Sequence, residues 1–156
     1  MKKLYMPSRA LLVMDMVNVY VYGERPLIHI AKRGKLIINV KKAVDWAHRK
    51  KIPVIYVNSA FRKNDPILKV IGYRSQAVSG SVGAQIIPEI TSEKGDFVLE
   101  KRGYDGFWKS GLDKLLKRLK VKEIYLCGQQ TDCCIRETGV TAAHLGYKVF
   151  ILADCV

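Results

Sequence analysis

The sequence predicts an α/β fold, namely a single-domain three-layer α/β/α sandwich around a mostly parallel, Rossmann-like sheet. Short apolar segments alternate along the chain with segments of helical periodicity, which is the pattern of strands connected by helices. The length of 156 residues fits one domain, residues 1–156, with a sizeable core. Because 49% of the residues are hydrophobic and 26% are charged, we expect a globular rather than a disordered chain.

Five apolar segments have the length and composition of buried strands. Most are continuous runs with β-branched and aromatic residues, as expected of a parallel sheet that is covered on both faces. The first ends on Asp15, and the third is followed by Glu100 and Lys101. We interpret residues 16–26 as a loop and residues 58–92 as a long connection that contributes to a site. The predicted strands are residues 10–15, 53–57, 97–99, 121–127 and 147–152.

Three further segments are predicted to be helices. Residues 31–50 and residues 135–145 have apolar side chains at helical spacing. Another helix begins at Ser110, where the sequence resembles a capping box with Asp113 in place of the usual Glu or Gln. The expected buried positions are Ile37, Val40, Val44 and Ala47 in the first helix, and Leu112, Leu115, Leu116 and Leu119 in the one that follows Ser110.

The chain is strongly basic, with a formal net charge of +13 from 27 Lys and Arg against 14 Asp and Glu. Such a charge attracts anions in general and nucleic acid in particular. However, the basic residues are spread over the predicted solvent faces of the helices, and no stacking motif of aromatic and basic residues accompanies them. We therefore expect no specific binding of nucleic acid.

The cysteines indicate a reducing compartment. They lie at positions 127, 133, 134 and 155, which matches neither the C-x-x-C spacing of zinc sites nor the disulfide framework of secreted proteins. The three scattered histidines form no metal-binding pattern, and we expect no metal and no other cofactor. The apolar run of residues 10–14 is too short for a signal peptide or a membrane span. These features predict a cytoplasmic protein without membrane partners.

The segment of residues 128–135, GQQTDCCI, lies between a predicted strand and a predicted helix. Thr131 or Asp132 is placed to cap that helix. Cys133 and Cys134 then fall near its first turn, where free N–H groups and the helix macrodipole favour a thiolate. The alternative is that these cysteines only pack in the core, as buried cysteines commonly do.

Two charged residues are expected at the same edge of the sheet. Asp15 and Lys101 both follow strands, and the carboxyl ends of parallel strands share one edge, where ligands bind in such folds. By themselves these residues indicate a structural ion pair. Together with a cysteine at the start of a helix, they supply a proton acceptor, a cation and a nucleophile, which are the parts of a covalent hydrolysis site.

The sequence resembles the isochorismatase-like cysteine hydrolases, a family that includes nicotinamidases, N-carbamoylsarcosine amidases and ureidoacrylate or biuret amidohydrolases. The resemblance extends over essentially the whole chain. It is carried by LLVMDMVN (residues 11–18), GAQIIPEI (83–90), EKRGYDGF (100–107), GQQTDCCIRET (128–138) and GYKVFILADCV (146–156).

The resemblance implies a role for each central residue. Cys134 is the nucleophile, whereas Cys133 occupies a variable position. Asp15 accepts the thiol proton and later acts as an acid, and Lys101 stabilises the charged groups. A cis peptide is implied between Gln129 and Gln130, with the backbone N–H groups of Gln130 and Cys134 as the oxyanion hole. The implied reaction hydrolyses a small amide or ureido compound through a thioester.

Several positions depart from the family pattern. Where metal-binding relatives have Asp-x-His, this chain has Asn58 to Phe61, so the metal ligands are missing, and Arg74 stands near the position of a further His. Arginine suits recognition of carboxylates, so we expect a substrate with an acid group. Asp105 replaces the serine of the usual YSGF. The expected substrate-binding residues are Asn18, Phe61, Arg74 and Trp108.

The chain also stops just after the fifth predicted strand, where relatives continue with a helix and often a sixth strand. We therefore expect either a shortened protein or a neighbouring subunit on the open edge, in a homo-oligomer that is a dimer or a tetramer. Two other functions stay open. One is an isochorismatase-type hydrolysis of a vinyl ether, which does not need a cysteine nucleophile. The other is a non-catalytic α/β module that binds polyanions.

Overall fold

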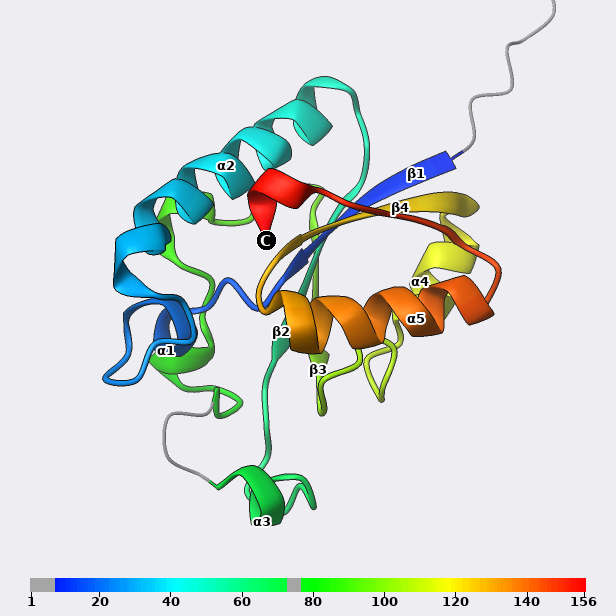
Figure 1. Ribbon diagram of the computed structural model, residues 1–156. Coiled ribbons are helices and arrows are strands. Elements are labelled where there is room, and N and C mark those ends of the chain that lie inside the picture. The colour runs from blue at the N-terminus through cyan, green and yellow to red at the C-terminus, as the bar shows by residue number, and fades with distance from the viewer. Residues whose placement is uncertain (1–7, 73–76) are drawn as a thin grey trace, which may run out of the picture.

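Five parallel strands form the centre of the protein in the computed structural model, which describes residues 8–72 and 77–156. The strand order is β3-β2-β1-β4-β5, and every neighbouring pair is parallel. The predicted parallel α/β fold is therefore confirmed (Figure 1). The strands are β1 (Ser8–Met14), β2 (Val54–Ser59), β3 (Phe97–Lys101), β4 (Val121–Gly128) and β5 (Lys148–Ile151).

Helices cover both faces of this sheet and give the three predicted layers (Figure 1). The long helix α2 (Ile30–Arg49) packs on one face, and α4 (Leu112–Arg118) and α5 (Arg136–His144) pack on the other. These bounds agree closely with the predicted helices because the periodic apolar residues are the ones that face the sheet. All four residues of the predicted stripe in α2 are buried, as are Leu112, Leu115 and Leu116 in α4. Leu119, which was also predicted to be buried, follows the end of α4 and is only half-buried.

The central strand β1 lies between the two halves of the core. Its residues 10–14 are completely buried. Leu11 and Val13 belong to the cluster under α2, whereas Leu12 and Met14 belong to the cluster under α4 and α5. Fully burying one such side chain contributes about 1.5–3 kcal/mol. Asp15 therefore follows a strand that is anchored from both sides.

The segment of residues 16–26, interpreted above as a loop, contains the short helix α1 (Asn18–Tyr22). A single helical turn leaves no periodic pattern in the sequence, and the β-branched residues of α1 have low helix propensity. Burial of Tyr20 and Val21 against the rest of the protein stabilises the turn instead.

The long connection after β2 begins later than predicted, because Asn58 and Ser59 belong to the strand. It contains the short helix α3 (Leu68–Ile71) and the 3-10 turns Val82–Ala84 and Pro88–Ile90. A third 3-10 turn, Ala153–Cys155, follows β5. Within the part of the chain that the structure describes, no helix has both the length and the apolar character needed to cross a bilayer.

The capping box predicted at the start of α4 does not form. Gly111 precedes the helix with a φ of 78°, in the left-handed region, whereas a capping residue is extended. Ser110 Oγ still accepts the N–H of Leu112 at 3.1 Å. The carboxylate of Asp113 turns to Lys117, one helical turn further on, at 2.6 Å.

Neither Thr131 nor Asp132 caps α5, contrary to the prediction. A π-helical turn (Thr131–Ile135) precedes this helix, and no side chain caps it. The carbonyl oxygen of Gln130 accepts the N–H groups of Cys133 and Ile135 at 3.2 and 3.0 Å. The main chain of Gln130 therefore takes the place of a side-chain cap.

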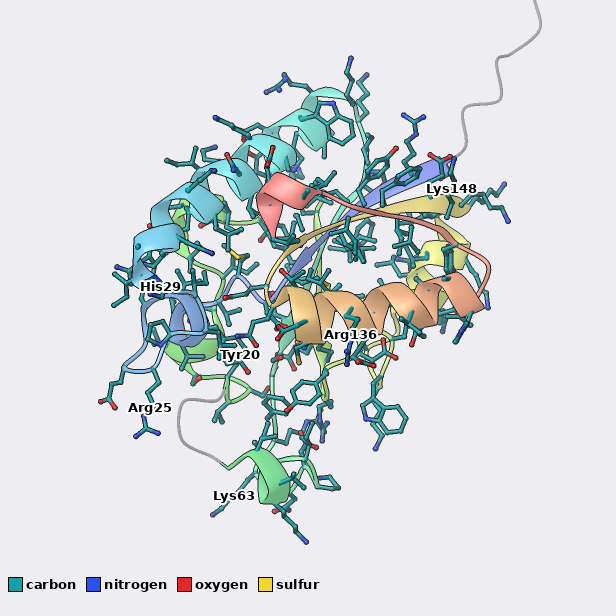
Figure 2. All side chains as sticks on the ribbon, in the orientation of Figure 1. Tyr20, Arg25, His29, Lys63, Arg136 and Lys148 are labelled. Atoms are coloured by element: carbon teal, nitrogen blue, oxygen red, sulfur yellow. The ribbon has the colours of Figure 1, made fainter. Side chains whose placement is uncertain are left out.

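The basic side chains that Figure 2 labels project from separate elements rather than from one face. They are exposed, and they come from the segment after α1, the connection after β2, the start of α5 and the start of β5. The four side chains do not form one basic patch. They are Arg25, Lys63, Arg136 and Lys148.

Candidate active site

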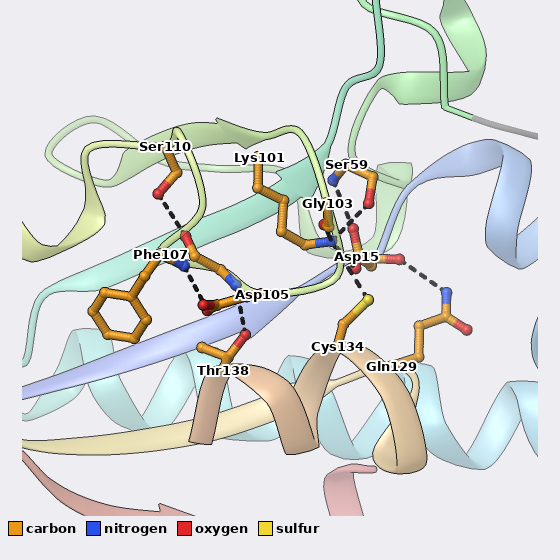
Figure 3. A network of polar contacts seen from close by, with 11 residues as sticks. Asp15, Ser59, Lys101, Gly103, Asp105, Phe107, Ser110, Gln129, Cys134 and Thr138 are labelled. Atoms are coloured by element: carbon orange, nitrogen blue, oxygen red, sulfur yellow. Dashed lines mark hydrogen bonds and ion pairs between the residues drawn. The ribbon is translucent and has the colours of Figure 1, made fainter. Parts of the chain in front are cut away.

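Asp15, Lys101 and Cys134 meet at the carboxyl edge of the sheet (Figure 3). The Nζ atom of Lys101 lies 2.9 Å from Asp15 Oδ2 and 3.4 Å from Cys134 Sγ. All three residues are buried, with exposed fractions of 1%, 0% and 8%. The sheet order brings them together because β1, which leads to Asp15, lies between β2, the neighbour of β3, and β4, which leads to Cys134.

Asp15 is held by several groups in an uncommon backbone conformation. Its φ is 53°, in the left-handed region that few non-glycine residues adopt. Its N–H donates to the carbonyl of Val57 at 3.3 Å, and its carbonyl accepts from Nε2 of Gln129 at 2.9 Å. The carboxylate oxygen Oδ1 accepts the N–H of Ser59 at 2.6 Å. These contacts fix the carboxylate next to Lys101 and offset the cost of the conformation.

Lys101 is a buried ammonium with several oxygen partners. Besides its contacts with Asp15 and Cys134, Nζ donates to Ser59 Oγ at 2.7 Å and to the carbonyl of Gly103 at 2.9 Å. Burial, the largest single influence, lowers the pKa of Lys101, but the combined effects of Asp15, Cys134 and Tyr20 outweigh it and raise the pKa above its usual range. The side chain is therefore a fixed positive charge.

Cys134 lies in the π-helical turn before α5. Burial, followed by the negative charge of Asp15, raises the pKa of the Cys134 thiol, and the nearby Lys101 lowers it by less. Burial and the charge of Asp15 therefore favour the thiol over the thiolate that the position at a helix start led us to expect. Cys134 is a thiol whose proton has to leave before the sulfur attacks.

Gly128 ends β4 and begins the short connection to the turn that carries Cys134. A Cβ atom at this position would lie 2.1 Å from the carbonyl oxygen of Met14, and φ is 104°, so the close approach to β1 requires glycine. The following peptide bond, between Gln129 and Gln130, is cis. The side chain of Gln129 points back to the main chain of Asp15 and links the two halves of the site (Figure 3).

None of the expected substrate-binding residues that the structure describes forms a hydrogen bond with the three central residues. Asn18 begins α1, and its Nδ2 donates to the carbonyl of Val82 at 3.0 Å. Phe61 is buried, with 1% of its surface exposed, whereas Trp108 is 56% exposed on the loop after β3. Arg74 lies outside the described residues.

Asp105, which replaces the family serine, fastens the loop after β3 to α5. Its Oδ2 accepts from Thr141 Oγ1 at 2.8 Å, and its Oδ1 accepts the N–H of Phe107 at 2.9 Å. The N–H of Gly106 donates to Thr138 Oγ1 at 2.8 Å (Figure 3). The loop that contributes the carbonyl of Gly103 is therefore fixed to the helix that follows Cys134.

Ser59 and Tyr20 are site residues that the sequence analysis missed. Ser59 contacts both Asp15 and Lys101, and the side chain of Tyr20 hydrogen-bonds with Ser59. The one available signal was the position of Ser59 at the end of its strand, which it shares with Lys101 at the end of β3. In the described ranges, no group of three His, Cys, Asp or Glu side chains is arranged to hold a metal ion.

Comparisons with known proteins agree with this geometry. A sequence model described as an isochorismatase domain matches residues 9–156. The crystal structure of N-carbamoylsarcosine amidase from Thermoplasma acidophilum is 32% identical, with a TM-score of 0.88 over 97% of this chain and 84% of that one. An isochorismatase-like hydrolase from Alkaliphilus metalliredigens is 30% identical, with a TM-score of 0.87 over 96% and 82%. A ureidoacrylate amidohydrolase of Pseudomonas syringae is 28% identical over 93% of this chain and 69% of its own length.

Proposed function

Because this chain belongs to the isochorismatase-domain family of hydrolases, we propose that it is a cysteine amidohydrolase that cleaves a C–N bond of a small amide or ureido compound. The observation that carries the proposal is the buried contact of Cys134 Sγ with Lys101 Nζ at 3.4 Å, beside the carboxylate of Asp15. A nucleophile, a proton acceptor and a fixed cation in one buried place are the parts that covalent hydrolysis needs.

The first step forms the thioester. Asp15 takes the proton of the Cys134 thiol, and the sulfur attacks the carbonyl carbon of the substrate. The backbone N–H groups of Gln130 and Cys134 bind the resulting oxyanion. Asp15 then returns the proton to the nitrogen of the leaving group, the C–N bond breaks, and the amine departs. Lys101 balances the negative charge that stays in the site throughout.

The second step releases the acid. Asp15 accepts a proton from a water molecule, whose oxygen attacks the thioester carbonyl. The C–S bond breaks, the carboxylic or carbamic acid leaves, and the proton returns to the sulfur of Cys134. One water molecule is consumed and one amine is released in each cycle, so the same carboxylate serves twice as base and twice as acid.

The activity is tested by the release of ammonia or amine from nicotinamide, N-carbamoyl amino acids, ureidoacrylate and biuret. We expect Cys134→Ala to abolish turnover, whereas the adjacent Cys133→Ala keeps most of it. Asp15→Asn removes the proton acceptor without a change of shape and should cost about a hundredfold to ten-thousandfold in kcat. If Cys133→Ala is the inactive variant, the choice of nucleophile is wrong.

We further propose that the substrate carries an acid group beside its amide, as in N-carbamoyl amino acids or ureido acids. The support comes from the sequence, which places Arg74 in the connection after β2, together with the exposed Arg62 and Lys63. Matched pairs of a free acid and its neutral ester are compared in the wild type and in Arg74→Ala. The acid should lose about ten- to a hundredfold in kcat/KM in the variant, while the ester changes little. Equal changes for both would exclude a role of Arg74 in reading charge.

A further inference from the structure

Ser59 contacts both charged partners of the site, although the mechanism above gives it no role. It is the last residue of β2, paired in register with Lys101 of β3, and 2% of its surface is exposed. Its main-chain N–H donates to Asp15 Oδ1 at 2.6 Å, and its Oγ accepts from Lys101 Nζ at 2.7 Å (Figure 3). One residue thus holds the carboxylate through its main chain and the ammonium through its side chain.

The hydrogen bonds of the ammonium are fully assigned. A lysine side chain has three N–H donors, and those of Lys101 go to Ser59 Oγ, the carbonyl of Gly103 and Cys134 Sγ. Asp15 Oδ2 lies 2.9 Å from Nζ as an ion pair, but it accepts no directed hydrogen bond. This oxygen is therefore held mainly by charge, and it lies within reach of both the ammonium and the Cys134 thiol.

We propose that Ser59 is a positioning residue, which diverts one N–H of Lys101 away from Asp15 so that Oδ2 stays free to exchange a proton with Cys134. Without the Ser59 hydroxyl, the released N–H has Oδ2 within reach as an unsatisfied acceptor. An Asp15 that is hydrogen-bonded to the ammonium is a weaker proton acceptor, so turnover falls. At the same time the Cys134 thiol is exposed to less of the negative charge of Asp15 that keeps it protonated, so it ionises more readily.

Tyr20 supports the Ser59 side chain from α1. The two side chains are hydrogen-bonded, and Tyr20 is 4% exposed on the inner side of α1 (Figure 2). Burial, followed by the negative charge of Asp15, raises the pKa of Tyr20 to about 12, so its hydroxyl adds no charge beside Lys101. The titratable groups that face Lys101 and Cys134 are Asp15 of β1, Tyr20 of α1, Tyr104 after β3 and Cys133 beside the nucleophile.

The test compares the wild type with Ser59→Ala, which lacks the hydroxyl, and Ser59→Thr, which keeps it and suits a strand. Alkylation by iodoacetamide is followed at Cys134 and Cys133 by peptide mapping, from about pH 6 to pH 10. We expect Ser59→Ala to lower the pKa of Cys134 by about one unit and to alkylate about tenfold faster near neutral pH. The alkylation rate of Cys134 divided by that of Cys133 should rise as well. Cys133 is the internal control, because a loosened site would speed its alkylation too. Ser59→Thr should resemble the wild type.

The effect on turnover rests on the proposed function, whereas alkylation does not need a substrate. In Ser59→Ala we expect kcat to fall about tenfold with KM unchanged, and Ser59→Thr to restore it. An unchanged pH profile of Cys134, a rise shared equally by Cys133, or a Ser59→Thr that behaves like Ser59→Ala would overturn the proposal. A shifted profile in a protein that hydrolyses no amide would instead refute the hydrolase function and leave the role of Ser59 intact.

Discussion

Removing one charge of the buried pair between Asp15 and Lys101 is expected to destabilise the protein by about 3–5 kcal/mol. The two side chains are 1% and 0% exposed, and their charged atoms are 2.9 Å apart. At this distance the attraction is about 6 kcal/mol for an effective dielectric constant of about 20, and it offsets much of the cost of taking both charges out of water. In Lys101→Met the carboxylate still bears that cost but has lost the attraction.

The free energy of unfolding is measured by urea denaturation of the wild type, Lys101→Met, Asp15→Asn and the double variant. The double variant should lose less than the sum of the single losses, because it leaves no unpaired charge behind. Lys117→Met is the matched control. Its pair with Asp113 is exposed, with 68% of the lysine side chain accessible, so its loss should be at most about 1 kcal/mol.

Two results would refute this reasoning. Strictly additive losses in the double variant would show that Asp15 and Lys101 do not act as one paired unit. A loss in Lys101→Met no larger than that in Lys117→Met would show that burial of the ammonium does not govern its contribution. In either case the assignment of Lys101 as a fixed charge of the site would have to be abandoned.

Three further predictions concern the thiols, the turn and the edge of the sheet. Burial raises the pKa of all four cysteines. Their contribution to the free energy of unfolding is therefore fully present below the unfolded-state pKa. Measured in reductant, this free energy should fall above about pH 8.5, because the thiols of the unfolded chain ionise there. Cys127→Ala should flatten that fall by up to about 1.4 kcal/mol per pH unit, and an equally steep fall in the variant would contradict this. Gly128→Ala should lower the free energy of unfolding by more than about 4 kcal/mol or prevent folding. The control Gly34→Ala, with open space around the added methyl group in α2, should raise it by about 0.4–1 kcal/mol. Comparable melting temperatures for the two variants would speak against the close contact of Gly128 with Met14. We also propose a homo-oligomer, since Ile151 is 48% exposed on the edge strand β5; a monodisperse monomer in sedimentation at micromolar concentration would exclude it.

The strands and the convergence of Asp15, Lys101 and Cys134 were predictable because each rests on a strong local signal. Buried parallel strands are continuous apolar runs, and the residues that follow them share one edge of the sheet whatever the strand order. The long helices followed from their periodic apolar faces. These signals act over a few residues and survive in a single sequence.

The contacts that tune the site were not predictable from local pattern. Ser59 and Tyr20 are a small polar residue at a strand end and an aromatic residue in a single helical turn, and neither belongs to a periodic motif. Their roles depend on how the Lys101 ammonium divides its three hydrogen bonds, which is decided only when α1, β2 and β3 have packed. The protonated state of Cys134 likewise depends on burial, which the sequence around it does not show.

Lys101 is carried by an outer strand of the sheet, and this position affects how long the site stays assembled under stress. Asp15 follows the innermost strand and Cys134 follows β4, which has neighbours on both sides, but Lys101 is delivered by β3, an outer strand that borders only β2. Outer strands detach in local fluctuations at a lower free energy than the centre of a sheet. We expect such local opening of residues 97–101 to withdraw the ammonium while the remaining layers stay assembled. For the proposed hydrolase we therefore expect loss of activity under mild heat or denaturant to precede global unfolding, and stronger contacts between β2 and β3 to delay that loss.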